Sequence, residues 1–426
     1  MYCCKCGTEL PDNAVFCSHC GSQTHALKST TTNQFSKRKS IILILSLSLC
    51  IILTLAAAVM VVPKHIVQPN VEIASSPSAD TLNYVTSPAH GYAYPITTDT
   101  LDGFHYSIMS DNTVRIDKYA GSDSIVFIPE SISGSPVTQI GSSAFAGNSS
   151  ITDVVLPESI TRIGNRAFHS CTSITNIQIP TSVTDIGDYA FTSTPWLNNK
   201  SDEFVIIGKN ILLKYNGMDS EVFIPVGVEE IYCDSFSDNQ TMEAIVIPST
   251  VTKIGAYAFA DSSSLITVSL PESIEFIGAL AFSNTPWFDN LSDEFVIVGA
   301  DILLDYNGTS SSVVIPQDVK SISSAFFCNQ YIESIQIPNG VTNIGPHAFF
   351  SCTNLKTISL PNSVSTIAEF AFANCFSLET IQLPSTLKCL EDGVFLNCNN
   401  VRLNVKEGSY AHGWAMENNV EFGLMN

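Results

Sequence analysis

The sequence predicts a β-rich repeat solenoid, preceded by a small cysteine-rich head and one membrane-spanning helix. An aromatic marker recurs at a nearly fixed spacing between Phe145 and Phe395. An uncharged apolar run covers residues 41–62, and two C-x2-C pairs lie within residues 1–22. With 426 residues, the chain is long enough to hold these parts as separate domains.

Composition and charge narrow the class of protein. Hydrophobic residues make up 45% of the chain and charged residues 14%, so the chain is not disordered. The formal net charge of -21 would repel phosphate, which excludes a nucleic-acid partner. Residues 1–40 hold 5 Lys and Arg against 2 Asp and Glu, whereas residues 65–426 hold 13 against 38. We therefore expect the basic head and the acidic body to face different surroundings.

The head, residues 1–22, carries Cys3, Cys6, Cys17 and Cys20 as two C-x2-C turns. Four thiolates at this spacing suit tetrahedral zinc, and an all-Cys site leaves no position for water, which predicts structural zinc. A disulfide pair is the alternative, and a reducing cytosol disfavours it. The segment resembles the short zinc-ribbon found at the N-terminus of many bacterial membrane proteins. Cys4 departs from that family, which usually carries Pro at this position.

The apolar run of residues 41–62 contains no charge, Pro or Gly. As a helix it would be roughly 33 Å long, enough for a hydrocarbon core of about 30 Å. A buried soluble helix is the alternative, although such helices rarely stay apolar on every side for so many turns. The sequence therefore predicts one transmembrane helix.

The flanking charges predict its orientation. Lys37, Arg38 and Lys39 precede the run and only Lys64 follows it closely, so we expect the N-terminus in the cytosol and the repeats outside. A cleaved signal peptide is the alternative, but the run exceeds the usual apolar core and follows a long head. We expect a basic linker over residues 23–40 and an extended Ser- and Pro-rich tether over residues 63–100.

A fixed period defines the body. The marker residues are Phe145, Phe168, Phe191, Phe236, Phe259, Phe282, Phe326, Phe349, Phe372 and Phe395. Most neighbours are 23 residues apart, a period typical of leucine-rich-type solenoids. In the stretch LITVSL from Leu265, apolar and polar residues alternate, so Thr267 and Ser269 point outward and Pro271 ends the strand. One coil cannot bury its apolar face, so neighbouring coils must stack.

Two wider spacings mark inserts at about residues 194–217 and 285–308. The first reads TPWLNNKSDEFVIIGKNILLKYNG and the second TPWFDNLSDEFVIVGADILLDYNG. Each has two β-rich runs around a Gly-containing turn, such as Glu203–Ile207 and Ile211–Tyr215, which predicts a hairpin in place of one coil. Because the two inserts are so similar, we infer that a block of about four repeats, including one insert, was itself duplicated.

The repeats, such as LPESITRIGNRAFHSC from Leu156, resemble the BspA-like leucine-rich repeat family over about residues 101–426. The resemblance implies a solenoid over residues 101–407, a C-terminal helix-and-strand cap over residues 408–426, and a bacterial surface protein that adheres to host proteins or other cells.

Four body cysteines, Cys171, Cys352, Cys375 and Cys398, lie three residues after a marker Phe, where other coils carry Asn, Ser or Thr. This interchange indicates a small buried position in which Cys packs as a small apolar residue. A disulfide framework is the alternative. The sequence contains no H-E-x-x-H, G-x-S-x-G or phosphate-binding glycine loop, so we expect no enzyme activity.

Outward-facing strand residues, mostly small and neutral, should form one regular sheet that contacts a ligand. The candidate contact residues are Asp153, Asn176, Gln178, Thr267, Ser269, Ser334, Gln336, Thr357, Ser359, Thr380 and Gln382. We expect a membrane-anchored cell-surface protein that binds extracellular protein or glycan through many weak contacts. A receptor or scaffold, linking an external ligand to a cytosolic partner of the zinc-ribbon, is the alternative. A hydrolase of surface polymers has no supporting residue set.

Overall fold

The computed structural model describes residues 95–425 except Asp392 and Asn419. The predicted zinc-ribbon, linker, transmembrane helix and most of the tether lie outside the described residues. Within residues 95–425 we find no helix long and apolar enough to cross a bilayer. The first strand, β1 (Pro95–Leu101), pairs antiparallel with β2 (Phe104–Met109). The sheet therefore already includes residues 95–100, which the sequence analysis assigned to the tether.

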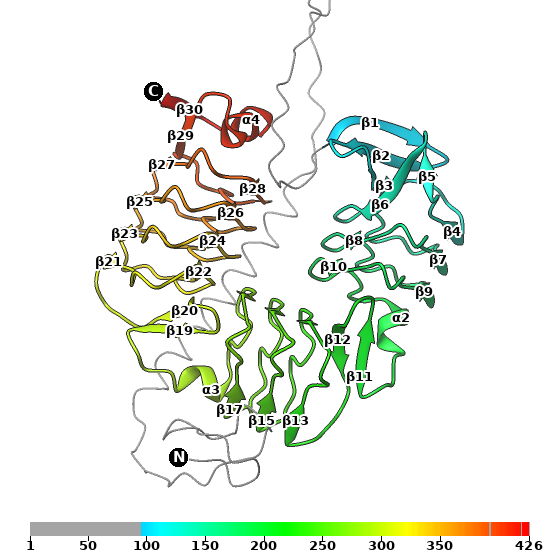
Figure 1. The fold of residues 1–426 in the computed structure, drawn as a ribbon, viewed down its shortest axis with the longest axis horizontal. Helices are drawn as coiled ribbons and strands as arrows, with labels where there is room; N and C mark the ends of the chain where they lie inside the picture. Colours follow the sequence, from blue (N-terminus) through cyan, green and yellow to red (C-terminus); the bar gives the residue numbers. More distant parts are fainter. Residues whose placement is uncertain (1–94, 392, 419, 426) are drawn as a thin grey trace, which may run out of the picture. The chain divides into compact units, whose positions relative to one another are not determined.

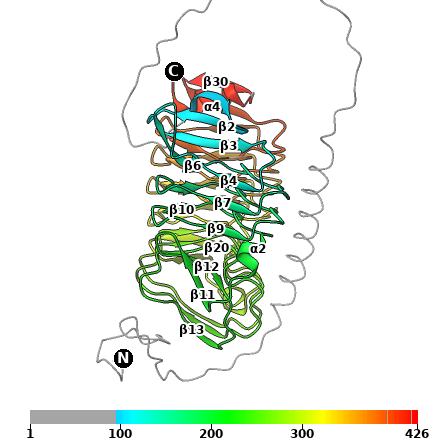
Figure 2. The ribbon, with the colours of Figure 1, turned by 90° about the vertical axis from the view of Figure 1, so that its right-hand side faces the viewer.

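Most coils of the solenoid contribute a long strand, of three or more residues, and a short strand, usually of two residues (Figure 2). The long strands are β4 (Ile125–Phe127), β7 (Asp153–Val155), β9 (Asn176–Gln178), β13 (Glu221–Phe223), β15 (Ala244–Val246), β17 (Thr267–Ser269), β21 (Ser312–Val314), β23 (Ser334–Gln336), β25 (Thr357–Ser359), β27 (Thr380–Gln382) and β29 (Arg402–Lys406). The short strands are β6 (Ser135–Ile140), β8 (Arg162–Ile163), β10 (Asp185–Ile186), β14 (Glu230–Ile231), β16 (Lys253–Ile254), β18 (Phe276–Ile277), β22 (Ser321–Ile322), β24 (Asn343–Ile344), β26 (Thr366–Ile367) and β28 (Cys389–Leu390); β5 (Ser131–Ile132) pairs with β6. Both kinds of strand pair parallel with the same strand of the next coil.

The solenoid consists of three blocks rather than one continuous stack (Figure 1). We define the first block as residues 95–198, the second as residues 204–289 and the third as residues 295–425. The long strands form three separate sheets, β4-β7-β9, β13-β15-β17 and β21-β23-β25-β27-β29-β30. The single regular sheet expected from the sequence is therefore wrong.

A β-hairpin opens each block. The first is β2 with β3 (Val114–Tyr119), the second is β11 (Phe204–Ile207) with β12 (Ile211–Tyr215), and the third is β19 (Phe295–Val298) with β20 (Ile302–Tyr306). The last two lie in the segments where the sequence placed paired β-rich runs. The second strand of each hairpin pairs parallel with the first short strand of its block. Each hairpin therefore starts a new sheet.

A row of stacked aromatic rings runs through each block. In the second block, Phe204 contacts Tyr215, and Phe236, Phe259 and Phe282 follow at centroid distances of 5.0 Å. Trp287 ends the row at 4.7 Å from Phe282. The first block begins in the same way with Phe104 and Tyr119, and the third with Phe295 and Tyr306. Aromatic stacking adds to the burial of these rings, so the row links the coils of each block.

Short helices end the first two blocks. In α2 (Pro195–Asn198), the Thr194 side chain accepts a hydrogen bond from the Leu197 N–H and Pro195 occupies the first helical position. Both features favour a helix start, and they place Trp196 over the last marker Phe. The equivalent helix of the second block is α3 (Pro286–Asp289). In the third block, α4 (Tyr410–Glu417) supplies Trp414 and β30 (Phe422–Met425) completes the sheet.

The second and third hairpins each separate two hydrophobic cores. Leu212 of β12 packs with Tyr215 and Phe236 in the core of the second block. Its neighbour Leu213 points the other way and packs in the core of the first block with Trp196. Both leucines are buried because both faces of this hairpin are covered.

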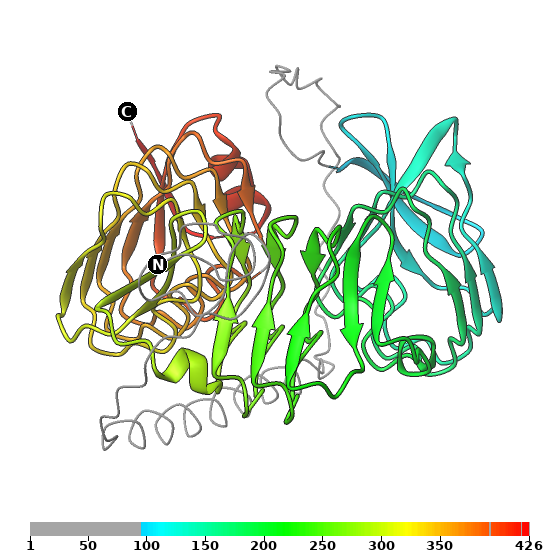
Figure 3. The ribbon, with the colours of Figure 1, turned by 60° about the horizontal axis from the view of Figure 1, so that its bottom comes forward.

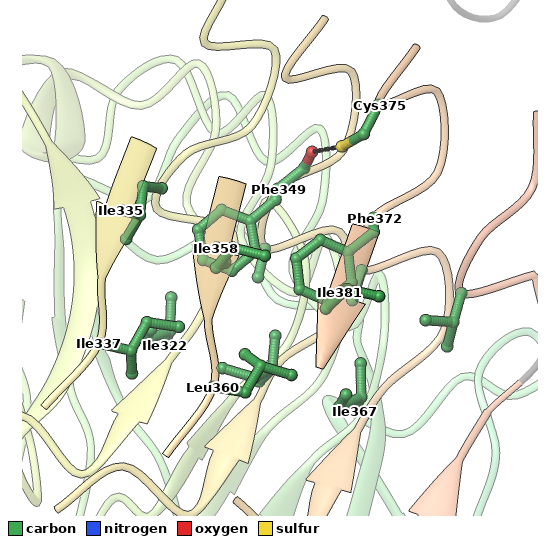
Figure 4. Packing of buried hydrophobic residues seen from close by; sticks show 14 of the residues in the cluster. Ile322, Ile335, Ile337, Phe349, Ile358, Leu360, Ile367, Phe372, Cys375 and Ile381 are labelled. Atoms are coloured by element: carbon green, nitrogen blue, oxygen red, sulfur yellow. Dashed lines mark hydrogen bonds between the residues drawn. The ribbon is translucent and has the colours of Figure 1, made fainter. Parts of the chain in front are cut away.

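In five coils, the small residue three positions after the marker Phe donates a hydrogen bond to the preceding coil; these residues are Cys171, Ser262, Cys352, Cys375 and Cys398. The Cys375 thiol lies 3.1 Å from the carbonyl oxygen of Phe349 (Figure 4). Ser262 makes the same bond to Phe236 at 2.8 Å. No disulfide joins the cysteines of residues 95–425, and burial raises the pKa of the Cys352 thiol to about 12. The Cys352 thiol is therefore a protonated packing group, and the disulfide alternative is not observed among the described residues.

Side chains replace the strand ladder where one block meets the next. The Tyr232 hydroxyl donates to the Gly187 carbonyl at 2.6 Å, and the Tyr189 N–H donates to the Cys233 sulfur at 3.1 Å. At the second boundary, Ser323 donates to the Ile277 carbonyl and the Leu280 N–H donates to Ser324. At a block boundary, these backbone groups have no short strand of the next coil to pair with. The hydrogen bonds to side chains therefore satisfy them instead.

Candidate functional site

The long-strand surface of the third block alternates between buried and outward-facing side chains. In β25, Ile358 is buried while Thr357 and Ser359 are exposed, and β27 repeats the pattern around Ile381. The parallel register places equivalent residues of successive coils side by side. The outward-facing positions of this block therefore form two straight rows across its sheet.

The structure distributes the predicted contact residues over three sheets. Asp153, Asn176 and Gln178 lie in the first block, and Thr267 and Ser269 lie in the second. The third block holds Ser334, Gln336, Thr357, Ser359, Thr380 and Gln382. The predicted residues therefore come together in sets of three, two and six.

The third-block set forms the most regular surface. Gln336, Ser359 and Gln382 are all exposed and follow one another in register, and Asn404 continues their row. In the parallel row, the Ser334 hydroxyl donates to the Ser312 hydroxyl at 3.0 Å. Hydroxyl and amide groups can both donate and accept hydrogen bonds. We call these two rows, from β23 to β27, the third-block face.

The first-block residues bond to each other. Asn176 Nδ2 donates to Asp153 Oδ1 at 3.1 Å, and the Thr152 hydroxyl donates to Asp153 Oδ2 at 2.6 Å. Hydrogen bonds from Thr152 and Asn176 lower the pKa of the Asp153 carboxyl. The carboxylate therefore stays ionised and adds a fixed negative charge to this smaller sheet.

The second-block sheet, drawn in green in Figure 3, carries fewer exposed side chains. Thr267 and Ser269 are half-buried, and Ala244 on the neighbouring strand is buried. This sheet offers fewer hydrogen-bonding groups than the third-block face.

The first long strand of each block carries an exposed apolar residue that the sequence analysis did not predict. Phe127, Phe223 and Val314 are 67%, 51% and 58% exposed and occupy equivalent positions in β4, β13 and β21. Each of these residues is followed by an Ile-Pro pair, as at the ends of other long strands. This pair was the signal in the sequence that could have placed them at outward-facing strand positions.

The short-strand side of the coils carries charged groups at the first block boundary. Lys253 Nζ lies 3.1 Å from Glu230 Oε1 and 3.7 Å from Asp185 Oδ1, so it joins the first two blocks. Burial raises the pKa of the Glu230 carboxyl to about 7, although Lys253 acts in the opposite direction. Asn165 also donates to Glu369 at 3.5 Å, so the turns on this side of the first and third blocks meet.

The histidines beside the marker residues are structural. His347 lies between the rings of Phe350 and Phe370, at 5.1 and 5.4 Å, and burial lowers its pKa to about 4. Burial likewise lowers the pKa of His169. Across the described part of the chain, we find no group of three His, Cys, Asp or Glu side chains placed to hold a metal ion.

Parallel long strands that end at Pro, a buried marker Phe and an exposed strand face define a leucine-rich repeat protein. The family model described as the BspA type leucine rich repeat region matches residues 105–214, 199–292 and 305–410, more than half of the chain. The chain belongs to the BspA-type leucine-rich repeat family. A zinc-ribbon domain model matches residues 2–24. No curated protein matches the chain.

Several solved leucine-rich repeat structures are similar to this chain. A leucine rich cell surface protein from Faecalibacterium prausnitzii A2-165 is 24% identical, with 77% of this chain and 99% of that chain covered and a TM-score of 0.31. The pneumococcal vaccine antigen PcpA is 20% identical, with 72% and 81% covered and a TM-score of 0.29. A T. pallidum leucine rich repeat protein is 23% identical, with 66% and 91% covered and a TM-score of 0.24. At these values the likeness says nothing about ligands.

Proposed function

We propose that this protein is a membrane-anchored cell-surface binding or adhesion protein and not an enzyme. Its repeat domain contacts an extracellular protein or glycan, with residues 41–62 as the single transmembrane helix. The N-terminus is cytosolic, and Cys3, Cys6, Cys17 and Cys20 bind one structural zinc ion there. The apolar length of residues 41–62 and the basic residues before them support this arrangement.

The third-block face is the observation that carries the proposal. Its side chains are neutral and capable of hydrogen bonding, and all except the half-buried Ser334 are exposed. The strands beneath them are fixed by buried Ile335, Ile358 and Ile381 (Figure 4). A rigid surface loses little conformational entropy when a ligand binds. Two parallel rows of such groups suit an extended ligand that makes several weak contacts.

Replacement of Gln336, Ser359 and Gln382 together by Lys tests the proposal. Cells displaying the full-length protein are screened for binding to matrix proteins and glycan arrays. We expect the triple change to abolish the interactions found, because it places three charges in one row. A matched control places three Lys at the exposed residues Thr342, Asn362 and Ser385 of the same block. If the first variant keeps every interaction of the wild type, the third-block face is not the binding surface.

A receptor or scaffold function is the second candidate, favoured by the zinc-ribbon match at residues 2–24. Such a protein would pass an external signal to a cytosolic partner of the head. Replacement of Cys3 and Cys6 by Ser should remove zinc, measured by elemental analysis of the full-length protein. If the protein acts only in adhesion, this change leaves ligand binding by cells intact and has no further effect. If the protein is a receptor, the change also abolishes capture of the cytosolic partner by the head.

A further inference from the structure

A groove lined by both apolar and acidic residues opens beside β4 in the first block. Its volume is about 340 Å³, and it lies between the turn that joins β1 to β2 and the outer edge of β4. Leu101, Phe104 and Tyr119 line one part of it, and Ile125 and Phe127 line the other. The groove is separate from the third-block face.

The edge of β4 along this groove is open for pairing. Among the described residues, β4 is the terminal strand of its sheet and pairs with β7. The Ser124 carbonyl and the Ile128 N–H bond toward β7, so the alternate backbone groups of Ile125 and Phe127 point away from it. The same two side chains are 50% and 67% exposed. An exposed edge with apolar side chains is a template for another strand.

The charges around the groove favour a basic partner. Asp102 and Asp123 are the charged residues that line it, and the Tyr119 hydroxyl donates to Asp123 Oδ2 at 2.8 Å. A second copy of the acidic body would be repelled. The chain's own residues 65–94 carry Glu72 and Asp80 and no Lys or Arg, so they lack a complementary charge.

We propose that the edge of β4 binds an extended segment of another protein in which apolar and basic residues alternate. The segment adds a strand to the β4-β7-β9 sheet through the backbone groups of Ile125 and Phe127. Its apolar side chains enter the groove, and its Lys or Arg side chains reach Asp102 and Asp123. This binding goes beyond the contact proposed for the third-block face.

A fluorescent peptide of alternating Val and Lys serves as the probe, with full-length protein and anisotropy as the readout. Phe127→Pro removes one outward N–H and leaves the bonds to β7 in place. We expect it to weaken binding by about tenfold or more. Phe223→Pro is the matched control, because Phe223 occupies the same position in β13 away from the groove, and it should bind as the wild type does.

A second variant tests the charges without altering the strand. Asp102→Asn with Asp123→Asn should also weaken binding by about tenfold, with the loss greatest at low salt. Asn suits position 102, whose φ of 47° is unfavourable for most other residues. The triple Lys change in the third-block face should leave peptide binding unaltered. Failure of the β4 proposal can therefore be distinguished from failure of the proposed function.

Several outcomes would overturn the proposal. These are the absence of saturable binding, equal binding of a Val and Glu peptide, or wild-type affinity in both groove variants. A dimer that Phe127→Pro dissociates in sedimentation experiments would identify a second copy as the occupant. Tighter peptide binding after replacement of residues 66–90 by a Gly and Ser linker would identify the tether as the occupant.

Discussion

Two adjacent leucines of β12 should stabilise different blocks. Leu212 is 0% exposed and packs in the second-block core, whereas Leu213 is 2% exposed and packs in the first-block core. A Leu→Ala change at either site removes the same atoms from a fully buried position. The expected loss is about 2–5 kcal/mol in the free energy of unfolding at each site.

Hydrogen exchange measured by mass spectrometry can assign each loss to a block. Local openings within a repeat domain have their own free energies, so a damaged block exchanges faster than an intact one. We expect Leu212→Ala to raise exchange in β13 to β18 and Leu213→Ala to raise it in β6 to β10. Peptides from the third block serve as the internal reference in both variants.

Identical exchange profiles for the two variants would contradict the assignment of separate cores. The third hairpin, β19 with β20, offers a repeat of the test. Leu303 packs in the third-block core and its neighbour Leu304 packs in the second-block core. Leu304→Ala should therefore resemble Leu212→Ala, and Leu303→Ala should affect the third block alone.

Three further changes test single contacts through thermal and urea unfolding. Gly217→Ala should destabilise the protein by about 1–3 kcal/mol, because the added methyl would overlap the ring of Tyr215; an unchanged midpoint would contradict this. Glu230 has a folded-state pKa of about 7 against an ordinary value of 4.5, so its stabilising effect is present below pH 4.5 and is lost as pH rises through 7. Relative to the wild type, Glu230→Gln should therefore become more stable as pH rises from 5 to 8, and a relative loss of stability over that range would contradict the sign. Cys352→Ala should cost about 1–3 kcal/mol by removing the donor to Phe326, whereas Cys352→Ser should cost less; equal losses would mean that the hydrogen bond contributes nothing.

The repeat architecture was predictable because each coil carries its own local signals. Alternation in a stretch such as that from Leu265 places side chains inside or outside without reference to distant residues. The marker Phe residues are buried and stacked, as in the pair Phe259 and Phe282. The hydrogen-bonding role of Cys375 was not predictable, because its partner lies in the preceding coil.

The division into three blocks was harder to predict because it depends on both faces of a hairpin. Ile211, Leu212 and Leu213 form an uninterrupted apolar run, and periodicity does not show which of them serves which core. The opening hairpin of the first block lacks the T-P-W signal of the inserts, so its equivalence to them was hidden. Its back face carries polar residues such as Ser107 and Asp117, because no block precedes it among the residues that the structure describes.

The division into blocks changes how the proposed binding surface can work. The first long strand of each sheet carries an exposed apolar residue, Phe127, Phe223 or Val314, whereas the third-block face is neutral and polar. The three sheets therefore present local binding sites of different chemistry. A ligand that spans two of them gains affinity only if their spacing is fixed. The bonds from Tyr232 and Ser323 across the block boundaries supply that restraint. Loss of a boundary bond should therefore weaken an extended ligand more than a short one, although neither ligand contacts the bond itself.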